Sequence, residues 1–84
     1  MNDVDMTKAV RDFLLGELMQ DQDPDSIDNT TQLISTGILS SLATLQLVTF
    51  LEDTFDISVK AREVGVDNMD SIADIVAFVQ SKQK

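Results

Sequence analysis

The chain has 84 residues, a formal net charge of −9 and a hydrophobic content of 43%. These values predict one small globular domain over residues 1–84 rather than a disordered chain. The acidic excess argues against binding to nucleic acid or to anionic membranes, which both need clustered Lys and Arg. The absence of Cys and His excludes disulfides, thiolate metal sites and a His-activated serine nucleophile. No apolar run approaches the length of a membrane span, and the acidic N-terminus lacks the apolar region of a signal peptide. We expect a free-standing, monomeric, cytoplasmic protein.

The first half of the chain predicts one helix followed by a long connection. Apolar spacing predicts a first helix from about Met6 to Met19, with Asp5 or Thr7 as its cap. A connection from about Gln20 to Leu39 follows, because Pro24 interrupts any helix there. Four apolar residues are expected to pin this connection to the core: Ile27, Leu33, Ile34 and Ile38.

The most apolar segment lies in the middle of the chain. It predicts a second helix from Ser41 to about Phe55, with Ser40 as the N-cap. A helix with this many apolar residues is either central to the fold or contacts a partner. The apolar residues of this segment are too many for one buried stripe: Leu42, Leu45, Leu47, Val48, Phe50, Leu51 and Phe55.

The last third of the chain predicts a short helical piece and a final helix. The short piece falls within Lys60–Val64, and the final helix begins after Asp70 or Ser71. Ser71 and Asp74 resemble a capping box. The apolar stripe of the final helix is Ile72, Ile75, Val76 and Val79. We therefore expect an all-α bundle of three main helices plus a short helix, with a long first loop.

The aspartates of the long connection resemble the start of an EF-hand calcium loop. Asp21, Asp23 and Asp25 occupy its first, third and fifth positions. The match then fails, because Ser26 stands where the loop needs Gly and Gln32 where it needs Glu. We therefore expect no dedicated metal site, and a metal-buffering protein is a minor alternative.

A glycine, a serine pair and regularly spaced apolar residues form an ordered set in the middle of the chain. The set consists of Gly37, Ser40, Ser41, Leu42, Leu47, Leu51, Glu52, Phe55 and Ile57. A second run, Asp67 to Ile72, precedes the final helix. Together these residues resemble the acyl carrier and peptidyl carrier protein family, whose pattern is a Gly-containing loop, Asp-Ser-Leu and a helix of the form LxxxLExxFxI. The resemblance covers essentially the whole predicted fold.

The resemblance implies a covalent attachment site at Ser41, which matches the family's modified serine. This residue would carry a 4′-phosphopantetheine arm derived from coenzyme A. The arm's thiol would hold an acyl or aminoacyl group as a thioester, so that the protein is a non-catalytic carrier acted on by other enzymes. The implied partners are a phosphopantetheinyl transferase, an acyl- or aminoacyl-loading enzyme, and downstream synthase, transferase or tailoring enzymes. A phosphodiester on Ser41 would lie at the positive end of the second helix, which favours an anion.

One position departs from the family pattern, because Ser40 replaces the usual Asp. Ser caps a helix about as well as Asp, but it removes a negative charge. In the family that carboxylate is thought to position the metal during arm transfer. Either serine could therefore be the acceptor in principle, and the alignment with Leu42 favours Ser41. The departure also keeps open an alternative, a carrier-like docking adaptor that is never modified.

The second helix also matches the family's docking surface. Ala43, Thr44 and Gln46 are uncharged, which resembles aminoacyl carriers, including the D-alanyl type, more than fatty acid carriers. This favours a specialised polyketide, nonribosomal peptide or aminoacyl transfer pathway. A fatty acid synthesis carrier is the alternative, because sequence drift on an exposed face could place the same uncharged residues there in either kind of carrier. The matching docking positions are Leu42, Gln46, Thr49, Glu52 and Asp53.

Overall fold

The computed structural model describes residues 3–18 and 23–83. Within these ranges every regular element is helical, which confirms the predicted all-α class. Among the same residues, no helix is both long and apolar enough to cross a membrane. The elements are α1 (Asp3–Phe13), the π-helical turn η1 (Leu14–Leu18), the 3-10 turn η2 (Pro24–Ser26), α2 (Ser41–Phe55), the 3-10 turn η3 (Ala61–Glu63), α3 (Val66–Met69) and α4 (Ile72–Lys82).

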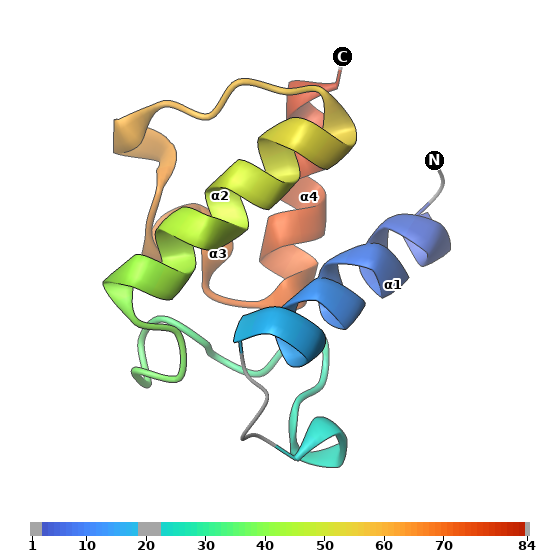
Figure 1. Cartoon of the computed structure of the whole chain (residues 1–84), viewed down its shortest axis with the longest axis vertical. Coiled ribbons are helices and arrows are strands. Elements are labelled where there is room, and N and C mark those ends of the chain that lie inside the picture. Colours follow the sequence, from blue (N-terminus) through green and yellow to red (C-terminus); the bar gives the residue numbers. More distant parts are fainter. Residues whose placement is uncertain (1–2, 19–22, 84) are drawn as a thin grey trace.

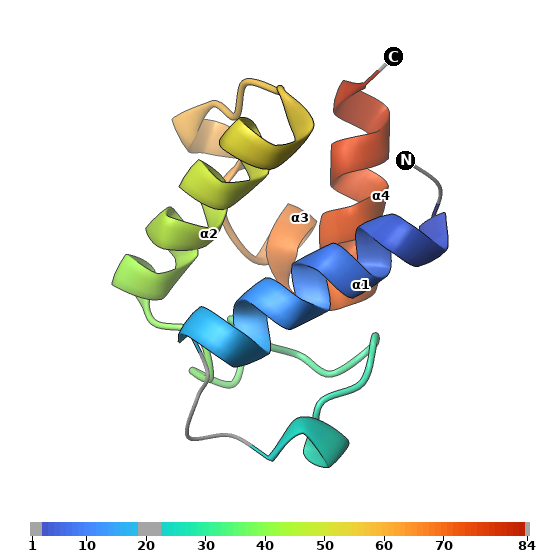
Figure 2. The ribbon, with the colours of Figure 1, turned by 45° about the vertical axis from the view of Figure 1, so that its right-hand side comes forward.

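The helices enclose a single core (Figures 1 and 2). α1 packs against α4, and the short α3 packs against the start of α4. The long connection closes one end of the bundle before it enters α2 (Figure 1). This arrangement places the amino end of α2 beside the connection rather than in the middle of the bundle.

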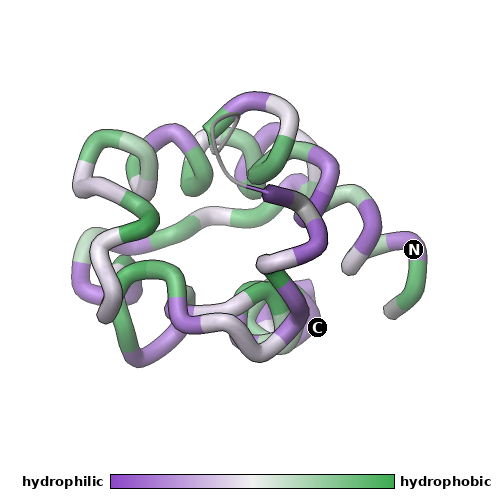
Figure 3. Tube along the Cα trace, turned by 90° about the horizontal axis from the view of Figure 1, so that it is seen from below, coloured by the Kyte–Doolittle hydropathy of each residue, from purple (hydrophilic) through white to green (hydrophobic). Residues whose placement is uncertain are grey.

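The core is almost entirely aliphatic, as a chain with four aromatic residues requires. Hydrophobic and hydrophilic residues are interspersed along the helical trace (Figure 3). Burial of each large apolar side chain contributes about 1.5–3 kcal/mol. The buried apolar residues are Met6, Val10, Leu14, Ile27, Leu33, Leu39, Leu47, Val48, Leu51, Phe55, Met69, Ile72, Ile75, Val76, Phe78 and Val79.

Three phenylalanines join α1 to the carboxyl half of α2. The rings of Phe13 and Phe50 stack with centroids 4.1 Å apart and an interplanar angle of 10°. Phe50 also meets Phe55 edge to face, at 6.2 Å and 88°. Such aromatic pairs add about 0.5–1.5 kcal/mol beyond the burial of their area. They fix the position of α1 against the later turns of α2.

The first helix differs from its prediction. α1 begins at Asp3, three residues before Met6, so the prediction that Asp5 or Thr7 caps this helix is wrong. Both residues have the side chains of a cap, but an acidic residue is also favoured inside the first turn by the helix dipole. After Phe13 the chain continues as the π-helical η1 to Leu18. The predicted end at Met19 lies outside the described residues.

The later helices agree with the sequence. α2 has the predicted bounds and the predicted N-cap, Ser40. α4 begins at Ile72 after the N-cap Ser71, whose Oγ accepts a hydrogen bond from the Asp74 amide at 3.1 Å. η3 lies inside the predicted short helical piece, whereas α3 was not predicted as a separate turn.

The long connection is held to the core at the predicted residues. Ile27 and Leu33 are buried, and Ile34 and Ile38 are half-buried. The amide of Ala73 in α4 donates to the carbonyl of Asn29 at 2.9 Å. From Ile27 onward the connection is therefore held against the core on its way to α2, although it contains little regular structure.

Candidate functional site

The two serines at the start of α2 differ in what their side chains do. Ser40 precedes the helix with an extended backbone, and its Oγ accepts a hydrogen bond from the Ala43 amide at 3.1 Å. Ser41 is the first helical residue, and it is exposed. Within the described part of the chain the Ser41 hydroxyl has no hydrogen-bond partner. The Ser41 oxygen is thus accessible and unengaged, whereas the Ser40 oxygen serves the helix.

Thr44 holds the backbone on which both serines depend. It is buried, and its Oγ1 donates a hydrogen bond to the Ser40 carbonyl at 2.8 Å. The Thr44 amide donates to the same carbonyl at 2.9 Å. The next amides of the first turn lie at the positive end of the helix dipole, which stabilises an exposed anion by about 0.3–1 kcal/mol. This end of α2 therefore suits a negatively charged group attached at Ser41.

A groove of about 280 Å³ lies directly beside Ser41. It joins three separate segments of the chain: the long connection, the first turn of α2, and the residues between η3 and α3. Gly65 takes φ +145°, a conformation that L side chains rarely adopt, although a Cβ there would have open space. Backbone conformation rather than crowding thus requires Gly at this position. The lining residues are Ile34, Ser41, Thr44, Leu45, Val64 and Gly65.

One exposed apolar residue, Leu45, lines the groove, and two others, Leu42 and Val66, directly follow the lining residues Ser41 and Gly65 in the chain. Leu42 is 67% exposed, Leu45 58% and Val66 48%. Large apolar side chains exposed this closely together are typical of surfaces that bind other proteins. The described part of the chain shows one further exposed large apolar residue, Val4 on α1, which is 74% exposed.

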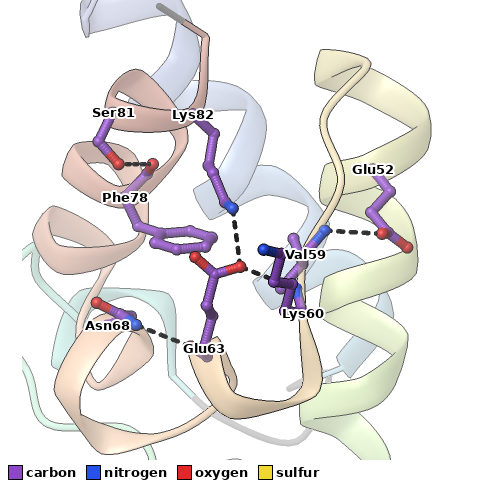
Figure 4. Close-up of polar contacts among 8 residues, drawn as sticks. All are labelled: Glu52, Val59, Lys60, Glu63, Asn68, Phe78, Ser81 and Lys82. Carbon is purple, nitrogen blue, oxygen red and sulfur yellow. Dashed lines mark hydrogen bonds and ion pairs between the residues drawn. The ribbon is translucent and has the colours of Figure 1, made fainter.

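Four of the five predicted docking residues share one exposed face of α2. Leu42, Gln46, Thr49 and Asp53 are exposed and recur at spacings of four, three and four residues, opposite the buried face. Glu52 is half-buried on the flank of the helix, and its Oε2 accepts a hydrogen bond from the Val59 amide at 2.9 Å (Figure 4). Glu52 therefore ties the following segment to α2.

Glu63 organises the segment that leads from η3 to the groove (Figure 4). Its Oε1 accepts the Lys60 amide at 2.9 Å and pairs with Lys82 Nζ at 2.8 Å. Its carbonyl accepts a hydrogen bond from Asn68 Nδ2 at 2.9 Å. The hydrogen bond from Lys82, followed by that from the Lys60 amide, lowers the pKa of Glu63 below its ordinary value. This network joins the end of α4 to the turn before Gly65.

Asp70 connects α3 and α4 to the long connection. Asp70 is a buried residue, and its carboxylate accepts hydrogen bonds from the amides of Ile34 and Ser35, both at 2.8 Å, and from the Ser35 hydroxyl at 2.6 Å. The hydroxyl and amide of Ser35, and more weakly the amides of Ile34 and Leu33, lower the pKa of Asp70 although burial opposes them. The carboxylate is therefore held as an anion by backbone and hydroxyl dipoles.

The sequence did not identify Val64, Gly65 or Asp70 as parts of this site. Gly65 carried a usable signal, because a lone Gly between two short helical pieces indicates a special turn. Asp70 was predicted to lie in the run that resembles the family pattern, before the last helix, but nothing in that run indicates a contact with the long connection. Its partners lie 35 and 36 positions away, so no local pattern reveals them.

Two aspartates in the described part of the connection, Asp23 and Asp28, accept hydrogen bonds within local turns. Asp28 Oδ1 accepts the Thr30 amide at 2.9 Å and the hydroxyls of Thr30 and Thr31 at 2.9 and 3.0 Å. These bonds lower the pKa of Asp28. Among the described residues, no group of three acidic, His or Cys side chains could hold a metal ion, and Asp21 lies outside them.

Comparison with known proteins identifies the family. Residues 8–79 match the family described as "phosphopantetheine attachment site". The chain belongs to this family. Membership implies a covalently attached 4′-phosphopantetheine group. The start of α2 fits such a group, because it combines an accessible hydroxyl, a positive helix end and a neutral neighbour at Ser40.

Curated relatives of the chain are D-alanyl carrier proteins. Those of Streptococcus pyogenes serotype M5 (strain Manfredo), serotype M49 (strain NZ131) and serotype M1 are each 39% identical to it over 51 residues. The matched segment covers 61% of this chain and 65% of each relative, which is slightly under two thirds of their length.

Proposed function

We propose that Ser41 carries the 4′-phosphopantetheine group and that the protein is a non-catalytic carrier of acyl or aminoacyl groups. The observation that supports this most directly is the contrast between the two serines within the family match. Ser41 presents an exposed, unengaged hydroxyl at the first position of α2, whereas the Ser40 oxygen accepts the capping hydrogen bond.

The residues around Ser41 would bind and orient the attached group rather than react. When bound, 4′-phosphopantetheine supplies a terminal thiol that holds the carried group as a thioester. Ser40 and Thr44 keep the first turn of α2 in place, and its amides favour the phosphodiester anion. The exposed face with Leu42, Gln46, Thr49 and Asp53 would contact the phosphopantetheinyl transferase, the loading enzyme and the downstream enzymes. Glu52 would support that face through Val59.

An aminoacyl group is the cargo that the observations favour. The relatives are D-alanyl carrier proteins, and the first turns of α2 are uncharged, with Ala43, Thr44 and Gln46 on them. We therefore place the protein in an aminoacyl transfer pathway, ahead of fatty acid synthesis.

Arm transfer in vitro tests the attachment site. The protein is incubated with coenzyme A, Mg²⁺ and a promiscuous phosphopantetheinyl transferase, and its intact mass is measured. We expect the gain of one phosphopantetheine in the wild type and in Ser40→Ala, and no gain in Ser41→Ala. Modification that persists in Ser41→Ala would move the site to another residue. An unmodified wild type would favour the docking adaptor.

The cargo is tested on protein isolated from its native source. Intact mass before and after treatment with hydroxylamine, which cleaves thioesters, reports arm and cargo separately. We expect the mass of an amino acid to be lost, with the arm retained. A fatty acyl mass would instead support the fatty acid synthesis alternative.

A further inference from the structure

The carboxylate of Asp70 is the main polar attachment between the long connection and the helices behind it. Three hydrogen bonds reach its side chain from Ile34 and Ser35, and a fourth joins the Leu33 amide to the Asp70 carbonyl at 2.6 Å. Three consecutive residues of the connection thus donate hydrogen bonds to one residue, which lies between α3 and α4. The apolar contacts of Leu33 and Ile34 are non-directional, so these bonds set the orientation of the backbone here.

The segment after these three residues closes on itself and leads into α2. The Gly37 amide donates to the Ile34 carbonyl at 3.1 Å, and the Leu39 amide donates to the Leu33 carbonyl at 2.9 Å. Gly37 takes φ +79°, which permits this tight path. Residues 33–39 therefore form a closed turn, attached at its first residues to Asp70 and followed directly by Ser40.

A continuous chain of contacts consequently runs from Asp70 to the serine. Asp70 fixes the start of the closed turn, the turn places Ser40, and Ser40 caps the helix whose first residue is Ser41. The same turn supplies Ile34 to the groove beside Ser41. No other carboxylate of the described residues accepts backbone hydrogen bonds from this turn.

We infer that Asp70 is a positioning residue for the acceptor serine: its carboxylate orients the closed turn of residues 33–39, and the turn sets the direction in which the Ser41 hydroxyl is presented to the transferase. The inference rests on the proposed function, which assigns the arm to Ser41. Asp70 itself does not contact the reacting oxygen. It acts by aligning the Ser41 hydroxyl, because a small displacement of a nucleophile strongly lowers the rate of its reaction.

The kinetic test separates alignment from docking. Arm transfer is measured with purified variants that circular dichroism shows to be folded at the assay temperature. Asp70→Ala removes all side-chain acceptors, and we expect kcat to fall about tenfold or more while KM for the carrier stays within about twofold, because the exposed face of α2 is unchanged. Asp70→Asn keeps one oxygen for the two amides, and we expect it to restore part of kcat.

Asp28→Ala is the matched control, because Asp28 also accepts backbone and hydroxyl hydrogen bonds in the same connection. Its bonds end within its own turn, at Thr30 and Thr31. We expect kcat and KM to stay near wild-type values. An equal loss of kcat in both variants, or a wild-type kcat in folded Asp70→Ala, would overturn the inference. If Asp70→Ala does not fold, Ser35→Ala removes one of the three side-chain bonds and is judged by the same criteria, with a smaller expected loss.

Amide hydrogen exchange gives a readout that does not depend on modification. We expect faster exchange at Ile34, Ser35 and Ala43 in Asp70→Ala, with little change in the middle of α4. Unchanged exchange at Ile34 and Ser35 would contradict the inference even if modification were slow. Failure of the wild type to accept the arm would refute the proposed function instead, and the exchange measurement would still decide whether Asp70 orders the turn.

Discussion

The amino end of α2 exposes Ser41, Leu42 and Leu45, whereas the carboxyl end buries Leu51 and Phe55 in the core. The carboxyl end is held mainly by apolar packing, with Phe50 between two other rings. The amino end is held by hydrogen bonds that lead back to Ser40 and Asp70. One helix thus combines an anchored end with an end that is accessible to partners. Apolar side chains at the accessible end remain available because the other end already secures the helix.

The largest expected effect is a difference in stability between two Leu→Ala variants, one at each end of α2. Leu51→Ala removes a fully buried side chain and should lower the free energy of unfolding by about 2–5 kcal/mol. Leu42→Ala removes an exposed one and should change it by about 0.5 kcal/mol or less. Urea unfolding followed by circular dichroism measures both. Similar losses in the two variants would show that the ends do not differ in this way.

A smaller effect is expected on partner binding. Leu42→Ala should raise KM for the carrier in arm transfer by about three- to tenfold, because exposed apolar anchors near an interface centre contribute about 1 kcal/mol or more. Val4→Ala is the control, since Val4 is equally exposed but lies on α1. A rise in KM for the Val4 variant as well would mean that the exposed end of α2 has no special role.

The cap at the amino end should contribute about as much as caps elsewhere. Ser40→Ala loses the hydrogen bond to Ala43 and should cost about 1 kcal/mol in the free energy of unfolding. Ser40→Asp keeps the bond and adds a favourable charge, so stability should be retained. Thermal unfolding of both variants and of Ser41→Ala checks this, with Ser41→Ala expected near wild type. A destabilised Ser41→Ala with an unaffected Ser40→Ala would reverse the roles of the two serines.

The smallest effect is a pH dependence specific to the amino end. Because the native pKa of Asp70 lies below its ordinary value of 3.8, its carboxylate stabilises the fold above that pH. This stabilisation is lost as the pH falls through the lower native pKa. The difference in Tm between wild type and Asp70→Asn should therefore be largest above about pH 4 and shrink below it. Ser35→Ala should show a reduced pH dependence, because it removes the largest cause of the shift. A difference in Tm that is constant with pH would contradict this account.

The sequence predicted the elements whose signals are local. Both bounds of α2 and the start of α4 were correctly predicted, because a capping serine stands directly before a dense apolar pattern in each. The start of α1 was missed because Asp5 and Thr7 have the side chains of caps, and only the fold decides which candidate is used. α3 was missed because four residues are too few to show a period.

The same distinction applies to the site. Ser41 was predicted as the attachment site from the order of residues around it, and the structure places it, exposed, at the first position of α2. Glu52 was predicted as a docking residue, and its carboxylate accepts a hydrogen bond from the Val59 amide. The sequence could not predict this bond, because it depends on the path that the chain takes after α2. Asp70 contributes through contacts between distant segments, which neither spacing nor composition can reveal. Gly65 did carry a local signal, but its place beside Ser41 depends on the fold.

The long reach of the Asp70 hydrogen bonds has a consequence for the order of folding. Because 35 and 36 positions separate this carboxylate from Ser35 and Ile34, these bonds close a large loop and need both distant segments in place. During synthesis, Ser41 leaves the ribosome well before the residue that supports its turn. A newly made chain therefore completes its acceptor site late. A modifying enzyme that required an ordered serine would therefore act on the finished carrier and not on the nascent one.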